Sequence, residues 1–126
     1  ILKIKIKLKK IIKNIKDKNK SIYVLGASTK GNTILQYLDI DNKIIPFATE
    51  RNKEKFGAKT IGSNIQIINE DIIKKNPPDY QLVLPWHFKK EIINREKNYL
   101  KNGGKLIFPL PTIKIITKKN YLKNVK

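Results

Sequence analysis

The residues with the clearest chemical potential form a short polar loop, 26–32, that follows an apolar run. Two glycines give this loop backbone angles closed to other residues and allow a ligand to approach the chain closely. Exposed N–H groups at the start of the next helix favour an anion, and the loop adds two hydroxyls and one cation. A phosphate or pyrophosphate is therefore the expected ligand. The candidate phosphate-binding residues are Gly26, Ser28, Thr29, Lys30, Gly31 and Asn32.

The spacing of this loop matches neither of two common phosphate-binding patterns. A P-loop has lysine directly after its second glycine, where this chain has Asn32. The dinucleotide pattern G-x-G-x-x-G needs glycine where Ser28 stands. We therefore expect a phosphate loop of another type. The alternative is an ordinary strand-to-helix turn, in which a hydroxyl of Ser28 or Thr29 caps its own helix.

Length and composition limit what else the chain can do. Its 126 residues suit one domain but are few for a complete two-substrate enzyme. The chain starts with Ile1 and lacks methionine, so we expect a piece of a longer polypeptide. With no cysteine and one histidine, no metal site is expected. Neither a membrane span nor a signal peptide is apparent, so no membrane association and a cytoplasmic location are the expectation.

The net charge of +18 raises the possibility of nucleic-acid binding, but its distribution argues otherwise. Residues 1–20 hold nine lysines and one aspartate, and residues 113–126 hold five lysines and no acid. Lysine outnumbers arginine 26 to two, whereas specific nucleic-acid sites rely on arginine forks and stacking aromatics. Nucleic acid is therefore an unlikely partner. A basic structural or nucleic-acid-binding protein stays the alternative from a different class.

Strand and helix patterns alternate along the chain. Apolar residues at 3–4 spacing predict a basic amphipathic helix or linker arm over 1–19, and residues 118–126 form a basic tail. The expected order over 20–117 is strand 21–26, helix 30–38, strand 43–48, strand 65–68, helix 70–75, strand 80–84, helix 89–101, strand 105–108 and an edge strand 113–116. This pattern predicts an α/β, Rossmann-like three-layer domain with a mostly parallel sheet of about five strands.

In such a sheet, ligands bind beyond the carboxyl ends of the strands, where the strand order reverses. That rule adds four residues to the candidate site: Glu50, Arg51, Trp86 and His87. Each also has a simpler interpretation. Glu50 and Arg51 can form an ion pair with each other, and an aromatic side chain such as Trp86 more often covers core. His87 can donate to a phosphate or sugar oxygen, but one histidine makes no metal site.

Four segments resemble the C-terminal domain of SAM-dependent C-methyltransferases that act on dTDP-linked deoxysugars. They are GASTKGNTILQY at 26–37, PFATERNKEKFG at 46–57, NPPDYQLVLPWHFKKEIINRE at 76–96 and GGKLIFPLP at 103–111. The resemblance spans about residues 20–112, and it is the order and spacing of the segments that make it specific.

The resemblance implies a role in methyl transfer to a carbon of a dTDP-linked keto-deoxysugar. In the family, a zinc-binding domain and a SAM-binding methyltransferase domain precede this one, and the catalytic base belongs to the central domain. This segment is thus expected to bind no cofactor, to have no catalytic residue of its own and to hold the nucleotide sugar. The SAM-binding domain is the expected partner, in cis or as a separate chain. A stand-alone Rossmann-like module for another nucleotide is the alternative.

Overall fold

The computed structural model describes residues 2–26, 29–51, 54, 56–60 and 62–125. Six strands form one sheet in the order β3-β2-β1-β4-β5-β6. The first five are parallel, and β6 runs antiparallel to β5. The predicted α/β fold with a mostly parallel sheet is confirmed. The strands are β1 (Ile22–Leu25), β2 (Phe47–Glu50), β3 (Gln66–Asn69), β4 (Tyr80–Val83), β5 (Lys105–Phe108) and β6 (Lys114–Ile116).

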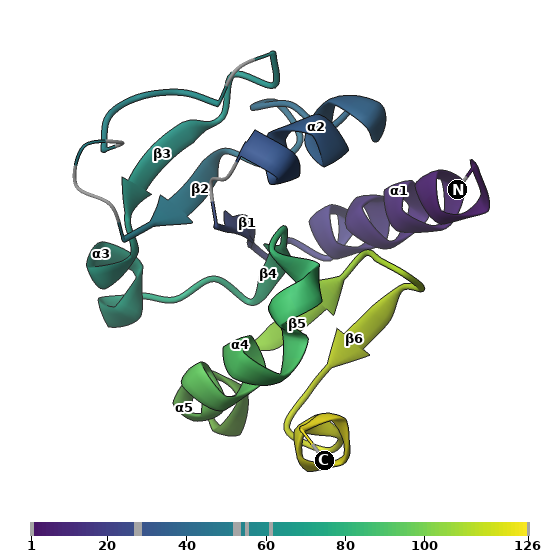
Figure 1. Cartoon of the computed structure of the whole chain (residues 1–126), viewed down its shortest axis with the longest axis vertical. Helices are drawn as coiled ribbons and strands as arrows, with labels where there is room; N and C mark the ends of the chain where they lie inside the picture. The colour runs from purple at the N-terminus through teal and green to yellow at the C-terminus, as the bar shows by residue number, and fades with distance from the viewer. Residues whose placement is uncertain (1, 27–28, 52–53, 55, 61, 126) are drawn as a thin grey trace.

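Helices cover both faces of this sheet and make the fold three-layered (Figure 1). On one face lie α1 (Leu2–Asp17) and α2 (Thr29–Tyr37). The other face carries α3 (Glu70–Lys75), α4 (Lys89–Arg95), α5 (Lys97–Lys101) and two 3₁₀ segments, η2 (Trp86–Phe88) and η3 (Tyr121–Asn124). Among the described residues, no helix has the length and apolarity to cross a membrane.

The N-terminal helix α1 packs into the main core. Its apolar residues recur at helical spacing, so Leu8, Ile12 and Ile15 lie on one face and are buried. They share a cluster with Val24 of β1 and Leu82 of β4. The lysines between them point outward, as binary patterning requires. The basic amphipathic character expected over 1–19 is thus built into the covering layer of the domain.

The second core is smaller and lies under α4 and α5. Val83 and Phe108 of the sheet meet Ile93 and Leu100 of these helices. Tyr121 of η3 packs on the same cluster and is 8% exposed. No local pattern predicts this anchoring, because Tyr121 stands in a lysine-rich segment.

The two largest differences from the sequence-based expectation concern the segments 43–48 and 89–101. The strand expected at 43–48 was wrong: residues 42–44 form a turn, and β2 starts at Phe47. Asp41 causes the shift, since its carbonyl accepts from the N–H groups of Ile44 and Ile45. Ile45 is nevertheless fully buried. Its apolar side chain reflects burial in the core and does not indicate a strand.

The helix expected over 89–101 is divided into α4 and α5. Glu96 separates them, with φ −98° and ψ +20°. Its N–H still donates to the Ile92 carbonyl at 2.9 Å, and its carbonyl accepts from Leu100 N at 3.0 Å. The apolar spacing continues through the break, which is why the pattern resembled one helix.

Candidate functional site

The site is centred on the place where the strand order reverses, between β1 and β4. Gly26 ends β1 with φ +88°, and its N–H donates to the Thr49 carbonyl at 3.1 Å. A Cβ on Gly26 would lie 2.8 Å from Cδ of Pro85, which follows β4. Only glycine fits this backbone angle and this approach. The carboxyl ends of β1, β2 and β4 therefore meet at one point, as the topology rule predicts.

A hollow of about 320 Å³ opens at this rim. It contains three of the candidates expected from the sequence, Gly26, Glu50 and Arg51. The rest of its wall comes mainly from the segment after β4 and from α3 and α4: Glu70, Pro85, Phe88, Glu91, Ile92 and Arg95.

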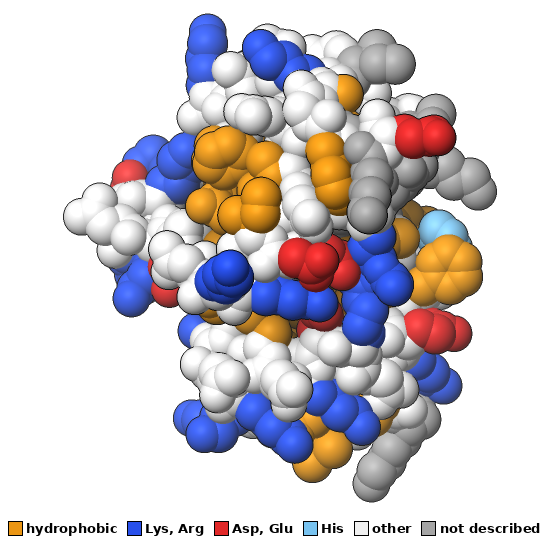
Figure 2. Space-filling view, turned by 90° about the vertical axis from the view of Figure 1, so that its left-hand side faces the viewer, with side chains coloured by type: hydrophobic (Ala, Val, Ile, Leu, Met, Phe, Trp, Pro, Cys, Tyr) orange, Lys and Arg blue, Asp and Glu red, His pale blue; other side chains and the backbone are white. Residues whose placement is uncertain are grey.

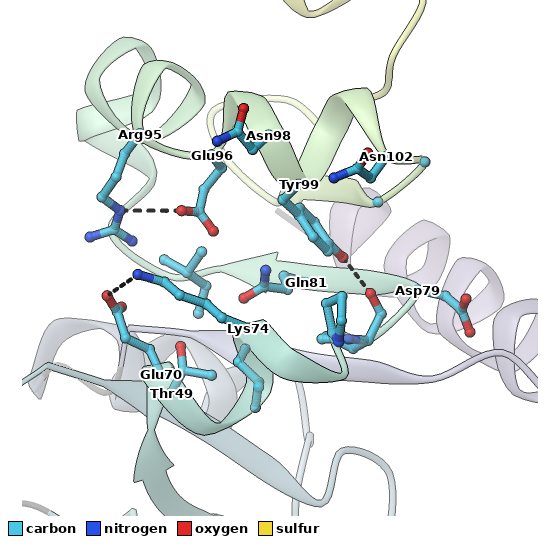
Figure 3. Close-up of a pocket in the computed structure, with 16 residues that line it drawn as sticks. Thr49, Glu70, Lys74, Asp79, Gln81, Arg95, Glu96, Asn98, Tyr99 and Asn102 are labelled. Atoms are coloured by element: carbon cyan, nitrogen blue, oxygen red, sulfur yellow. Dashed lines mark hydrogen bonds and ion pairs between the residues drawn. The ribbon is translucent and has the colours of Figure 1, made fainter.

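A second hollow, of about 470 Å³, lies on the sheet face between α3 and the pair α4–α5 (Figure 3). It exists because α3 has six residues and leaves part of that face without cover. Leu25, Thr49 and Gln81 of the sheet line it. Leu25, Thr49, Glu70 and Arg95 line both hollows, so the two form one continuous depression. We call this depression the groove.

Charged side chains bridge the middle of the groove. The Glu70 carboxylate lies 3.7 Å from Arg51 Nε and 3.8 Å from Lys74 Nζ. Arg95 Nε lies 3.5 Å from a Glu96 carboxylate oxygen. Figure 2 shows acidic and basic side chains gathered side by side on this face of the molecule, with hydrophobic ones above them. The groove is thus lined by ion pairs together with apolar side chains such as Leu25, Phe88 and Ile92, whereas the cores are apolar.

At the other end of the groove, Tyr99 ties its two walls together. Its hydroxyl donates to the Pro78 carbonyl at 2.8 Å, and Figure 3 shows the ring reaching across from α5. Burial raises the pKa of Tyr99 above its ordinary value, more than its hydrogen bonds lower it. Gly104 is required beneath it, because a Cβ there would lie 2.3 Å from the ring.

Comparison with known proteins identifies the family of this chain. The family model for the C-methyltransferase C-terminal domain matches residues 1–111. The chain belongs to this family. The resemblance seen in the sequence is therefore confirmed, and the match includes α1.

One curated relative and one solved structure are similar to this chain. The chain is 29% identical over 120 residues to C-methyltransferase NovU of Streptomyces niveus, covering 95% of this chain and 29% of that protein. It thus spans less than a third of this relative. The structure of UDP-D-quinovosamine 4-dehydrogenase from Vibrio fischeri matches with a TM-score of 0.53 at 16% identity, over 82% of this chain and 98% of the other. At that identity the likeness shows the fold alone.

The loop predicted to bind phosphate in this C-methyltransferase C-terminal domain is described in part. Thr29, Lys30 and Gly31 open α2, so backbone N–H groups of a helix start lie beyond β1 as expected. Ser28 lies outside the described residues. Asn32 accepts a hydrogen bond from Ser63 Oγ at 3.0 Å, which joins α2 to the segment before β3. Ligand contacts by these residues stay predictions.

The four candidates expected at the rim do not all line the groove. Glu50 and Arg51 line the groove, but Arg51 pairs through its side chain with Glu70, while its backbone N–H donates to Glu50 at 2.8 Å. Trp86 packs partly against the second core, and His87 is exposed beside it. Neither is among the residues that line the groove. Their proposed contact with a ligand stays a prediction.

Most residues of the groove were not among the sequence candidates, and those at the rim hollow include Glu70, Phe88, Glu91 and Arg95. One signal could have found Arg95, because the rarity of arginine that drew attention to Arg51 applies equally to it. Phe88 directly follows two candidates and is 52% exposed. No spacing rule would have chosen the two glutamates, since α3 and α4 come together only in the folded chain.

Lys89, at the start of α4, has a pKa below its ordinary value. Burial lowers it first, and the neighbouring ammonium groups of Lys114 and Lys90 lower it further. Lysine side chains thus lie close together near the start of α4.

Proposed function

We propose that the chain is the nucleotide-sugar-binding domain of a SAM-dependent C-methyltransferase acting on a dTDP-linked keto-deoxysugar. The observation that carries this proposal is the family match over residues 1–111. The position of the groove supports it, because ligands of Rossmann-like sheets bind at the carboxyl edge where strand order reverses. Gly26 allows Pro85 to pack closely against the backbone at that point, so the ends of β1 and β4 meet at this edge.

In this proposal the chain holds and orients the substrate. Backbone N–H groups at the start of α2, with Lys30, bind the pyrophosphate, since a helix N-terminus and an ammonium both favour an anion. Proton abstraction beside the 4-keto group belongs to a base outside this chain, in the part of the longer relatives that it does not span. Fixing the sugar against that base is the domain's contribution to rate.

The cofactors of the family are assigned to other domains in this proposal. SAM supplies the methyl group when bound to the methyltransferase domain, which is the proposed partner of this one. A zinc site of the family's cysteine type does not fit here, because the chain has no cysteine and one histidine.

Calorimetric titration with dTDP at ~150 mM salt tests the proposal, because charges farther apart than ~8 Å are then screened. We expect saturable one-to-one binding that Lys30→Ala weakens by about 1–3 kcal/mol, the range for a charged hydrogen bond. Lys20→Ala removes the same charge before β1, at the opposite edge of the sheet, and is the matched control. Tighter binding of NAD or ATP would contradict the proposal in favour of a general nucleotide-binding module.

A further inference from the structure

Both arginines of the chain lie on the groove, although 26 of its 28 basic residues are lysines. Arg51 directly follows β2, and Arg95 ends α4, 44 positions later. Both line the rim hollow together with Gly26. Arginine offers a planar fork of donors that lysine lacks, so its use twice at this one place indicates a need for two-pronged recognition.

Carboxylates hold the two guanidinium groups at the groove while leaving them available. The pairs Arg51–Glu70 and Arg95–Glu96 use Nε at 3.7 and 3.5 Å, which is longer than a good charged hydrogen bond. The two glutamates are largely buried, each with a side chain 16% exposed. Arg51 and Arg95 are more open, at 69% and 35%. The two glutamates are therefore more buried than the arginines they hold.

The charges around the arginines decide which anion fits. Five of the chain's ten acidic residues line the groove: Glu50, Glu70, Asp79, Glu91 and Glu96. Only three of its 28 basic residues do so among the described part of the chain, the two arginines and Lys74. This excess of carboxylates disfavours an extended polyanion, so an anion bound here must be compact and lie at the two arginines. Its carboxylates can accept hydrogen bonds from hydroxyls of the same ligand.

We propose that Arg51 and Arg95 together clamp the diphosphate of the nucleotide sugar at the rim hollow. This inference rests on the proposed function and extends it, because it adds a second set of phosphate ligands to Lys30 and the start of α2. Binding replaces the long Nε contacts by shorter bonds to phosphate oxygens. The exposed ring of Phe88, which lines the same hollow, is available to pack on an apolar face of the ligand.

The test uses charge-conserving changes, so that the net charge of +18 stays the same. Arg51→Lys and Arg95→Lys should each weaken dTDP binding by roughly 10-fold, because the bidentate fork is lost while the cation remains. Lys20→Arg, the reverse change at an exposed position before β1, should leave the affinity unchanged. Thermal unfolding midpoints within about 2 °C of wild type would show that the variants are folded.

The possible results separate this inference from the proposed function. Wild-type dTDP affinity in both arginine variants, with weaker binding by Lys30→Ala, would overturn the clamp and keep the proposed function. Absence of saturable dTDP binding by the wild-type chain would overturn both. Loss in the arginine variants without loss in Lys30→Ala would support the clamp and move the phosphate site from α2 to the groove.

Discussion

The two faces of the sheet are built from the same kinds of residue but are covered differently. On one face, the sixteen-residue α1 and the nine-residue α2 cover strands that contribute Val24, Ala48 and Leu82 to one apolar core. On the other, α3 has six residues, and the sheet presents Thr49 and Gln81 to the groove instead. We call them the covered face and the open face.

The difference between these faces shows where a small domain can bury polar side chains. Thr49 and Gln81 are 1% and 3% exposed, yet no described buried side-chain polar atom lacks a hydrogen-bond partner. Buried polar groups cost little when satisfied, and a great deal when they are not. The open face therefore holds the groove beside the smaller apolar core, while the covered face carries the larger one. Four changes test this division.

The largest effect is expected from Leu8→Ala on the covered face. Leu8 is fully buried on the inner face of α1, and shortening it leaves a cavity, so we expect a loss of about 3 kcal/mol in the free energy of unfolding. Urea denaturation measures it. Leu2→Ala, at a position 66% exposed on the same helix, should change stability by less than about 0.5 kcal/mol. Equal effects of the two changes would mean that α1 does not cover the sheet in solution.

Gly26→Ala tests the point where the strands converge. The new methyl group meets Pro85 at 2.8 Å and the backbone keeps φ +88°, so we expect a loss of about 2–3 kcal/mol. Gly57→Ala is the matched control, because φ there is +82° but nothing lies within 4 Å of the added Cβ. It should cost about 1 kcal/mol from the backbone angle alone. Similar losses in both variants would show that the close approach to Pro85 contributes nothing.

Tyr99→Phe removes the hydroxyl that joins the walls of the groove. We expect a loss of about 1 kcal/mol, since the Pro78 carbonyl loses its donor at 2.8 Å. The pKa of Tyr99 is raised in the folded state, so its stabilising contribution is complete below the unfolded pKa of about 10 and is lost as the pH rises above it. Above pH 10, the free energy of unfolding of the wild-type chain should therefore fall more steeply than that of Tyr99→Phe. Parallel curves from chemical denaturation would contradict this assignment.

The smallest effect is expected at the surface of the covered face, from Asp39→Asn. Hydrogen bonding and charge attraction from Lys5 and then Lys9 lower the pKa of Asp39, and all three side chains are at least partly exposed. A carboxyl whose pKa is lower in the folded than in the unfolded chain stabilises the fold at pH values above its unfolded pKa. This contribution is lost as the pH falls through its folded pKa. The variant should differ slightly from wild type at pH 7 and converge with it in acid. Asparagine tolerates the φ of +55° at this position, which makes it the fitting replacement. A difference that persists in ~1 M salt would argue against an exposed ion pair.

Much of the fold could be predicted because local patterns and global packing agree. The elements 70–75 and 105–108 match α3 and β5 residue for residue, since each is bounded by clear signals such as Asn76 before two prolines and Gly103 before Gly104. The strand expected at 43–48 failed because Ile44 and Ile45 are apolar for reasons of burial and sit in a turn made by Asp41. Hydrophobicity reports burial, and reports backbone conformation only indirectly.

The sequence by itself determined the α/β order of elements, the family and the edge of the sheet at which a ligand is expected, because these follow from periodicity, turn residues and motif order along the chain. Only the tertiary structure decided which side chains share the groove. Arg51 and Arg95 are 44 positions apart, and their common position depends on the crossing from β3 to β4 and on the shortness of α3. Distances between elements are set by packing across the sheet, and no local pattern encodes them.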